Sequence, residues 1–459
     1  MNRVTFFVIF LSGAVFALLV SHLSNLRKTP QHKTSVQVFR AEILNQYKDT
    51  FFPLPSAGTI DVEEESTLGV VIKNLQKAQK SSKPPKPIER KANNQEALAS
   101  LHAALEKRLQ GHHDKALKLF QHAVALAPTH PDVLNHYGEF LEHTQKDVVE
   151  ADRLYLRALS LSPSHNRAMT NRQRTSPVVD ALDKENLKRI DDKRNTLGRI
   201  PSADSSLRRA KREAYFQHVY HSVGIEGNTM SLSQTRVILE TGMAVGGKSL
   251  IEHGEILGLD AALKYLNNTL LRGKPPGRLE IEDILALHRR VMGYVEPFEA
   301  GTFRRTQVFV GGHVPPPPSE VSLQVAQLVN WLRSDEALQL HPIRYAALAH
   351  YKLVYIHPFT DGNGRTSRLL MNLILMQAGY APVIIPKQER QRYYEYLEVA
   401  NSGDVRPFIR YIAECTEQTL ELYLWATREY SAQIPALSAD LSAEQDHERI
   451  ILGNDDDIV

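Results

Sequence analysis

Cysteine is almost absent from this chain, and that absence removes two whole classes of protein. Cys415 is the only cysteine among 459 residues, so neither an intramolecular disulfide nor a multi-thiolate zinc site can form. The lack of disulfides does not identify the cellular compartment, because an oxidising lumen also tolerates a protein without disulfides. The net charge of +3 is small for the length and does not favour nucleic-acid binding.

Long apolar runs are also scarce, and the one at Val4–Val20 is near the lower length limit of a membrane span. Arg3 before it would also suit a cleavable signal peptide, but no small-x-small cleavage motif follows. We therefore favour an uncleaved signal anchor at residues 1–22. More positive residues follow the run than precede it, which favours a cytosolic body, whereas the N-glycosylation sequon at Asn267 favours a lumenal one. The residues alone leave the topology open.

An internal repeat follows a polar, Pro- and Lys-rich stalk at residues 23–94. Its first copy has Ala116, Phe120, Ala123 and Pro128, and 35 residues later the chain has Ala151, Tyr155, Ala158 and Pro163. This pattern resembles the tetratricopeptide repeat and predicts two repeats at 95–165, with a concave face for a partner. Two unrelated amphipathic helices are the alternative. Two repeats are too few for a free solenoid, so we expect them to pack on a connecting helix at 166–200.

The rest of the chain is predicted to be mostly helical, from residue 201 to residue 430. Apolar spacing indicates helices at 208–223, 233–241, 281–291, 322–334 and 343–355. The one convincing β element is Gln307–His313, which ends in a Gly-Gly turn and predicts a small β-hairpin flap. The acidic tail at 431–459 is expected to be disordered.

Two segments could bind phosphate. Gly242–Ser249 matches the P-loop pattern G-x-x-x-x-G-K-[ST], with Lys248 as its lysine. A true P-loop follows a buried strand, but residues 233–241 have helical spacing and no βαβ alternation surrounds them. We interpret this segment as an interhelical loop, with a P-loop ATPase as the alternative.

The second segment, residues 357–368, has the sequence H-P-F-T-D-G-N-G-R-T-S-R. Its glycines allow backbone amides to form an anion-binding nest, and a helix that begins near Gly364 would add its positive end. Arg365 and Arg368 lie on one face of that helix's first turn, where arginine opposes the helix dipole. Phosphate binding explains their presence, whereas a simple capping turn would not explain His357 and Asp361.

These residues match the signature loop of the Fic family, whose members transfer AMP from ATP to hydroxyl side chains. A second segment, Ser222–Asn228, resembles the inhibitory S/T-x-x-x-E-G/N helix of that family. The resemblance extends over about residues 205–425 and predicts an all-α Fic domain at 201–430, with its inhibitory helix at 222–228. The complete layout resembles the metazoan branch of the family that resides in the endoplasmic reticulum.

The resemblance implies a role for each site residue. His357 would be the general base, and Asp361 would hold Mg²⁺ or Mn²⁺ against the phosphates of ATP. Glu226 would pair with Arg368 and inhibit transfer, although taken alone it is an ordinary helix carboxylate. The other expected nucleotide-binding residues are Val308, Phe309, Val310, Gly311, Gly362, Asn363, Gly364, Arg365, Thr366, Ser367, Arg368, Tyr393, Tyr394 and Asn401.

The resemblance also implies partners and location. The expected substrate is the Hsp70 chaperone BiP, bound in part by the tetratricopeptide repeats, and the same site would remove AMP from it. A homodimer would form through a surface that contains Leu250, and Asn267 would carry a glycan. The protein would be a single-pass type II protein of the endoplasmic-reticulum membrane with a lumenal catalytic domain. The alternative is a tetratricopeptide adaptor with a silent Fic domain.

Overall fold

The computed structural model describes residues 87–429, and every regular element in that range is a helix. The predicted anchor at 1–22, most of the stalk and the acidic tail lie outside the described residues. No helix between residues 87 and 429 combines the length and apolarity needed to cross a membrane. The mostly α-helical fold class is confirmed. The chain divides into two units, residues 1–180 and 181–459, within one long helix.

The first unit contains α4 (Pro87–Leu109), α5 (His113–Leu126), α6 (Pro131–Phe140), the π-helical turn η2 (Leu141–Gln145), α7 (Val148–Leu161) and the first half of α8 (Asn166–Gly198). The repeat positions Ala116, Phe120, Ala151 and Tyr155 are fully buried in one core. Helices α5 and α7 end just before Pro128 and Pro163 respectively, where the missing amide cannot continue a helix. Assignment of these helix pairs to the tetratricopeptide class stays a prediction.

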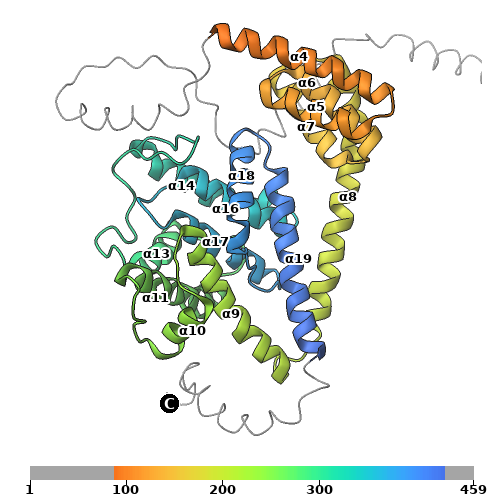
Figure 1. Ribbon diagram of the computed structural model, residues 1–459. Coiled ribbons are helices and arrows are strands. Elements are labelled where there is room, and N and C mark those ends of the chain that lie inside the picture. The colour runs from red at the N-terminus through yellow and green to blue at the C-terminus, as the bar shows by residue number, and fades with distance from the viewer. Residues whose placement is uncertain (1–86, 430–459) are drawn as a thin grey trace, which may run out of the picture. The chain divides into compact units, whose positions relative to one another are not determined.

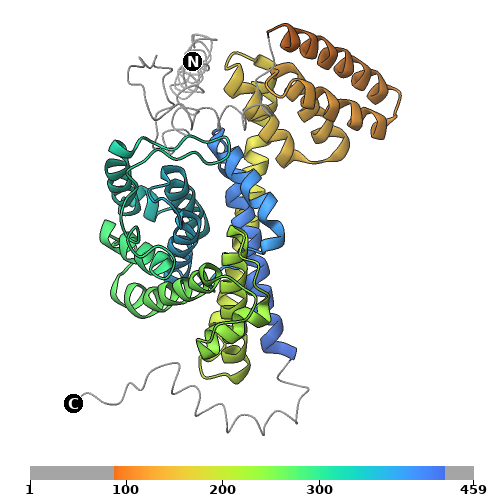
Figure 2. The ribbon, with the colours of Figure 1, turned by 60° about the vertical axis from the view of Figure 1, so that its left-hand side comes forward.

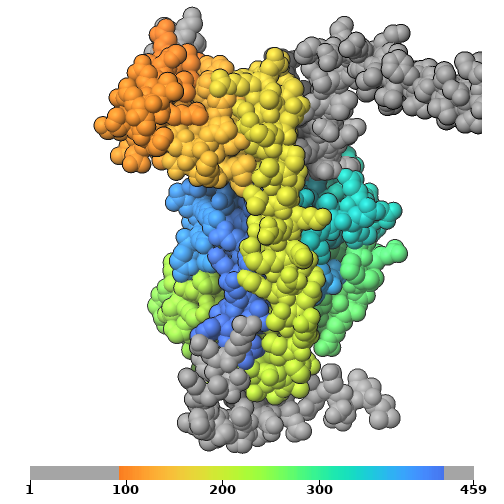
Figure 3. Space-filling view, turned by 90° about the vertical axis from the view of Figure 1, so that its right-hand side faces the viewer, coloured from red at the N-terminus to blue at the C-terminus, as the bar shows by residue number. Residues whose placement is uncertain are grey.

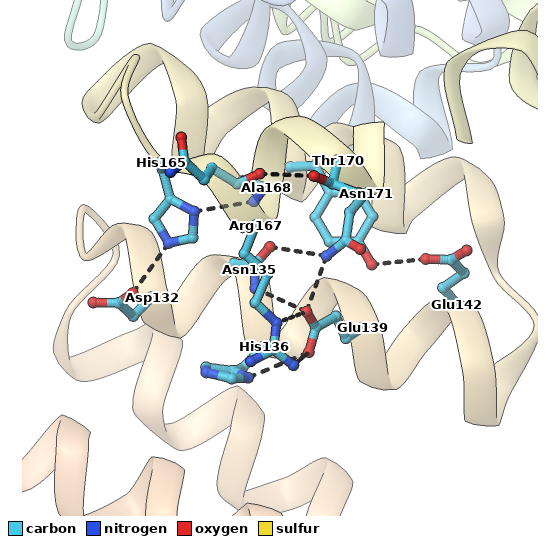
Figure 4. A network of polar contacts seen from close by, with 12 residues as sticks. Asp132, Asn135, His136, Glu139, Glu142, His165, Arg167, Ala168, Thr170 and Asn171 are labelled. Carbon is cyan, nitrogen blue, oxygen red and sulfur yellow. Dashed lines mark hydrogen bonds and ion pairs between the residues drawn. The ribbon is translucent and has the colours of Figure 1, made fainter. Parts of the chain in front are cut away.

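A polar network joins α6 to the start of α8 within this unit (Figure 4). The buried carboxylate of Glu139 accepts bonds from Asn135 at 3.0 Å, Asn171 at 2.9 Å and Arg167 at 2.6 Å. Burial alone would raise the pKa of Glu139, but hydrogen bonds from His136, Asn171 and Arg167 lower it to about 2. We call these residues the Glu139 network. The network holds α6 against the start of α8 through a carboxylate that stays ionised.

The second unit begins with the second half of α8 and continues through the helices that carry the site. They are α9 (Ser205–Glu226), α10 (Leu232–Thr241), α11 (Leu250–Tyr265), the π-helical turn η3 (Leu266–Leu270), α12 (Leu271–Gly273), α13 (Ile281–Met292), α14 (Pro318–Leu332), α15 (Asp335–Leu338), α16 (Pro342–Ile356), α17 (Asn363–Gln377), the 3₁₀ turn η4 (Lys387–Glu389), α18 (Arg390–Asn401) and α19 (Arg406–Glu429).

Helix α17 lies at the centre of the second unit, beside α16 (Figures 1 and 2). Every residue from Arg365 to Leu375 is buried, as expected for a helix surrounded by other helices. A helix buried on all sides cannot tilt without disturbing its neighbours, so the loop at its N-terminus has a fixed base.

The second half of α8 runs along α19 (Figure 3). Arg189 donates two bonds to Glu417, at 2.7 and 2.8 Å, and Arg410 donates to Asp183 at 2.7 Å. An ion pair with an exposed arginine, such as Arg189–Glu417, contributes at most about 1 kcal/mol. Both pairs join the part of α8 after residue 180 to α19, within the second unit.

The predicted β-hairpin flap is wrong. Between residues 87 and 429 the structure has no β-strand, and Gln307–His313 forms a turn closed by a single bridge between Val310 and His313. Gly311 adopts a φ of +57° at this turn. A longer ladder cannot form because Pro315–Pro318 follow directly and prolines have no amide to donate.

Candidate active site

His357 ends α16 in a left-handed conformation, with a φ of +49°. Such a conformation costs a residue with a side chain about 1 kcal/mol, so the surroundings must enforce it. Arg304 does so, because its Nε donates to the His357 carbonyl at 2.7 Å and its amide donates to the Pro358 carbonyl at 2.9 Å. The chain therefore turns sharply out of α16 and presents the imidazole at the start of the loop.

The protonation of His357 follows from its contacts. Its Nδ1 lies 3.3 Å from the carbonyl oxygen of Val354, which can only accept, so Nδ1 carries the hydrogen. Nε2 then has a free lone pair. Burial lowers the pKa of His357 below its ordinary value, despite the Val354 carbonyl, and the nearby Arg304 adds to the decrease. A neutral imidazole with an available Nε2 is what a general base requires.

The loop between α16 and α17 is braced from both sides. The Asn363 side chain accepts from the Phe359 amide at 2.9 Å and donates to the Phe359 carbonyl at 2.8 Å. The Phe359 ring stacks on His288, with centroids 3.6 Å apart. His288 accepts from the Gly301 amide at its Nδ1 and donates from Nε2 to the Asp361 carbonyl at 2.9 Å. Burial lowers the pKa of His288 to about 4, so this neutral tautomer persists.

The N-terminus of α17 offers amides to an anion. Gly362 precedes the helix with a φ of +75°, and a Cβ there would lie 2.8 Å from the sulfur of Met292. The first amide bonded within the helix belongs to Thr366, so those of Asn363, Gly364 and Arg365 point out of the helix end. This arrangement is typical of phosphate-binding helix termini.

Arg368 is buried and is held by α9. Its Nε donates to the Ser222 hydroxyl at 2.9 Å, and its second terminal nitrogen donates to Glu226 Oε1 at 2.6 Å. Its first terminal nitrogen, Nη1, is buried and has no hydrogen-bond partner among the described residues. Burial acts to lower the pKa of Arg368, but Glu226 raises it, so the guanidinium remains charged. The ion pair predicted between Glu226 and Arg368 is present.

The Glu226 carboxylate also lies across the start of α17. A Cβ placed on Gly364 would be 2.4 Å from Glu226 Oε1, so only glycine permits this approach. The Tyr394 hydroxyl lies 3.4 Å from the other carboxylate oxygen. The negative group of Glu226 thus occupies space beside the amides that would receive a phosphate.

Arg365 differs from Arg368 in its partners. It donates to Asp361 Oδ2 at 3.0 Å and to Glu255 Oε1 at 3.2 Å, and Glu255 accepts a further bond from Asn228 at 2.8 Å. The Asp361 side chain is 66% exposed, and Arg365 bonds only its Oδ2. The sequence places both arginines on one face, but they are bound by carboxylates from different helices.

The remaining predicted site residues are distributed as follows. Val308–Gly311 lie in the flap turn, which is anchored because His313 donates to the Tyr355 carbonyl at 2.8 Å, and Phe309 is largely exposed. Tyr393 is buried, with its hydroxyl 2.9 Å from His350. Asn401 is the exposed last residue of α18. The Arg368 guanidinium lies 6.0 Å from the centroid of the Tyr393 ring, which places Tyr393 beside the site. The adenosine-binding roles of Tyr393 and Asn401 stay predictions.

The segment Gly242–Ser249 is an interhelical loop, as expected. Gly242 caps the end of α10 and Ser249 caps the start of α11, with no strand in the described part of the chain before it. Lys248 donates to the Thr229 carbonyl at 3.0 Å instead of projecting over a phosphate nest. The P-loop alternative is wrong.

Leu250, at the start of α11, is exposed, and Asn267 is partly exposed. The predicted roles of Leu250 in a dimer interface and of Asn267 as a glycan site stay predictions.

Three supporting residues were not found from the sequence: Arg304, His288 and Glu255. Each acts through a contact between segments far apart in the chain. A single sequence gives no signal that separates Arg304 from the adjacent Arg305, since burial decides which of them braces the loop.

A neutral histidine base, an exposed carboxylate, and a glycine-capped helix end with two buried arginines define an enzyme of nucleotidyl transfer on an all-α fold. Comparison with known proteins supports this assignment. The model of the Fic/DOC family matches residues 278–375. The chain is 59% identical to a protein adenylyltransferase Fic of Culex quinquefasciatus over 76% of this chain and 70% of that one. It is 50% identical to the one of Aedes aegypti over 96% and 87%.

A solved structure, Fic-1 (residues 134–508) from C. elegans, is 45% identical and superposes with a TM-score of 0.67 over 72% of this chain and 98% of that one. The chain belongs to the Fic family and is a protein adenylyltransferase with ATP as its substrate. The silent-adaptor alternative is therefore disfavoured, because the relatives are named as enzymes and the loop residues are intact.

Proposed function

We propose that this enzyme both attaches AMP to a Ser or Thr hydroxyl of an endoplasmic-reticulum Hsp70 chaperone (BiP) and removes it. In this proposal the position of Glu226 selects the direction. The observation that carries the proposal is the contact of Glu226 with Arg368 and Gly364, at the place where the phosphates of ATP would bind. The chaperone itself is inferred from the family resemblance.

In the forward direction, the hydroxyl oxygen of the acceptor attacks the α-phosphorus of ATP. His357 Nε2 takes the hydroxyl proton, the bond to the β-phosphate breaks, and pyrophosphate leaves. The amides at the start of α17 receive the charge that develops on the α-phosphate. Arg368 would bind the terminal phosphates through Nη1, which has no hydrogen-bond partner among the described residues.

A divalent cation, Mg²⁺ or Mn²⁺, fits the site through Asp361. The described residues have no group of three metal ligands, but a substrate-bound Mg²⁺ commonly uses one carboxylate and the phosphates. Bound there, the cation would neutralise charge on the α- and β-phosphates. Asp361 can supply one oxygen, because Arg365 engages only Oδ2.

In the reverse direction, water attacks the phosphodiester that links AMP to the acceptor. Glu226 would accept a proton from the water, the bond from phosphorus to the acceptor oxygen would break, and AMP would be released. His357, which must start this direction protonated at Nε2, would give that proton to the departing oxygen. The same Glu226 that occupies the phosphate-binding position in one direction thus acts as a base in the other.

Several further proposals depend on the family resemblance. The repeats of the first unit would bind the chaperone, Leu250 would lie in a homodimer interface, and Asn267 would carry a glycan. The anchor at residues 1–22 would hold a type II protein in the endoplasmic-reticulum membrane with the site in the lumen.

Time-resolved mass analysis tests the proposal. Purified Hsp70 chaperone, unmodified or AMP-modified, is incubated with ATP and either wild type or Glu226→Gly. We expect Glu226→Gly to add AMP and to lose removal, while wild type mainly removes it. Removal that continues in Glu226→Gly would refute the switch. An unlabelled chaperone, with other proteins labelled by the same sample, would refute only the choice of acceptor.

A further inference from the structure

The last turn of α9, which carries Glu226, has a second contact in addition to that with Arg368. Lys387, the first residue of η4, lies across it. A Cβ placed on Gly224 would be 2.6 Å from Lys387 Cδ, so the methylene chain rests directly on the backbone of this turn. Gly224 lies two residues before Glu226, in the turn whose carbonyls accept from the Gly227 amide.

Two further interactions fix the position of Lys387. Its ammonium lies 4.2 Å from the centroid of the Tyr220 ring, within the range of a cation–π interaction. Its backbone amide donates to His221 Nδ1 at 3.2 Å. Burial lowers the pKa of His221 to about 4 and Lys387 contributes to the decrease, so the imidazole stays a neutral acceptor. One residue therefore contacts Tyr220, His221 and Gly224, which line one side of the turn.

We propose that Lys387 is a positioning residue that holds the last turn of α9 in place and so keeps Glu226 on Arg368. The inference rests on the proposed switch and adds a second control point, on the segment that leads into α18. Tyr394 of α18 also contacts Glu226, at 3.4 Å. Residues 387–394 thus reach the inhibitory turn twice, and loosening this segment releases the carboxylate.

The test is the effect of Lys387→Ala in two backgrounds. With Glu226 present, losing the methylene packing and the cation–π contact should raise AMP transfer about fivefold and lower AMP removal. With Glu226→Gly, the same substitution should leave transfer within about twofold, because there is no carboxylate left to hold. Lys387→Met, which keeps the chain over Gly224 without its charge, should give an intermediate rise.

Controls separate this role from a general loss of structure. Lys211→Ala removes an exposed lysine from the same helix and should change neither rate. Faster amide exchange of residues 222–226 in Lys387→Ala would show the loosened turn directly. A fall in transfer in both backgrounds would overturn the proposal in favour of a structural or substrate-binding role. If Glu226→Gly itself transfers no AMP, the proposed function fails, whatever Lys387 does.

Discussion

Glu139 in the first unit and Glu226 in the second each accept a bond from an arginine, but their surroundings differ. Glu139 accepts from two asparagines and an arginine and closes a network between α6 and α8. Glu226 accepts from Arg368, whose Nη1 is buried and has no hydrogen-bond partner among the described residues. A buried donor without an acceptor costs about 1–3 kcal/mol. The second arrangement is complete only when a ligand supplies the missing acceptor.

The comparison shows how to separate a structural carboxylate from a regulatory one. The structural one has all the donors it needs, and removing it leaves those donors stranded. The regulatory one occupies a place that another anion could take, so removing it exposes a binding site. The largest expected effect tests whether the second region is a catalytic site at all.

Replacing the base should abolish transfer. In the Glu226→Gly background, His357→Ala should reduce AMP transfer about 10²- to 10⁴-fold, because no other group accepts the hydroxyl proton. ATP affinity, measured by calorimetry, should stay within about threefold. His253→Ala, in the first turn of α11 and outside the site, is the matched control. Transfer that survives His357→Ala would show that the site has been misassigned.

Substitutions of Glu226 should raise the rate of AMP transfer by different amounts. Glu226→Gly should raise transfer at least about tenfold, because the ion pair to Arg368 and the bulk over Gly364 both disappear. Glu226→Gln keeps the bulk without the charge and should give a smaller rise. Label transfer from ATP to an acceptor protein measures both. Equal activity of the two variants would mean that charge alone, and not occupied space, inhibits the enzyme.

Much of the site followed from the sequence, because its residues are adjacent in the chain. The loop at 357–368 gave the base, the carboxylate, the glycines and the arginines, and the motif at 222–228 gave the partner of Arg368. The residues that brace the loop could not be predicted, since Arg304, His288 and Glu255 contact it from distant parts of the chain. The hairpin predicted at 307–313 is wrong, because the β-propensity of that segment does not reveal that the prolines after it exclude a ladder.

The contrasting substitution in the first unit is Glu139→Ala. It should destabilise that unit by about 2–4 kcal/mol, because the amides of Asn135 and Asn171 lose a charged acceptor. Amide exchange of α6 and the start of α8 should accelerate. AMP transfer to a short acceptor peptide should not change. Because the pKa of Glu139 is about 2, below its ordinary value, its contribution is present above about pH 4.5 and is lost as the pH falls toward 2.

The pH dependence of transfer reports His357. Its pKa lies below the ordinary histidine value of about 6.5, so the neutral base predominates at pH 7. The rate for Glu226→Gly should therefore be level from pH 8 to about 6.5 and decline only as the pH falls through the lowered pKa. A rate that already declines between pH 8 and 7 would indicate a histidine with a raised pKa, which the buried environment does not support.

The smallest expected effect concerns the P-loop pattern at 242–249. Lys248 donates to the carbonyl and the hydroxyl of Thr229, three residues after Glu226. Its ammonium is therefore already bonded to protein oxygens. Lys248→Ala should therefore leave ATP affinity within about twofold, since one exposed lysine bond contributes little. Arg368→Ala, measured in the same calorimetric titration, should weaken ATP binding strongly because it removes the unpartnered donor. If Lys248→Ala abolished binding and Arg368→Ala did not, the nucleotide would belong to the interhelical loop, and Glu226 would be a structural carboxylate like Glu139.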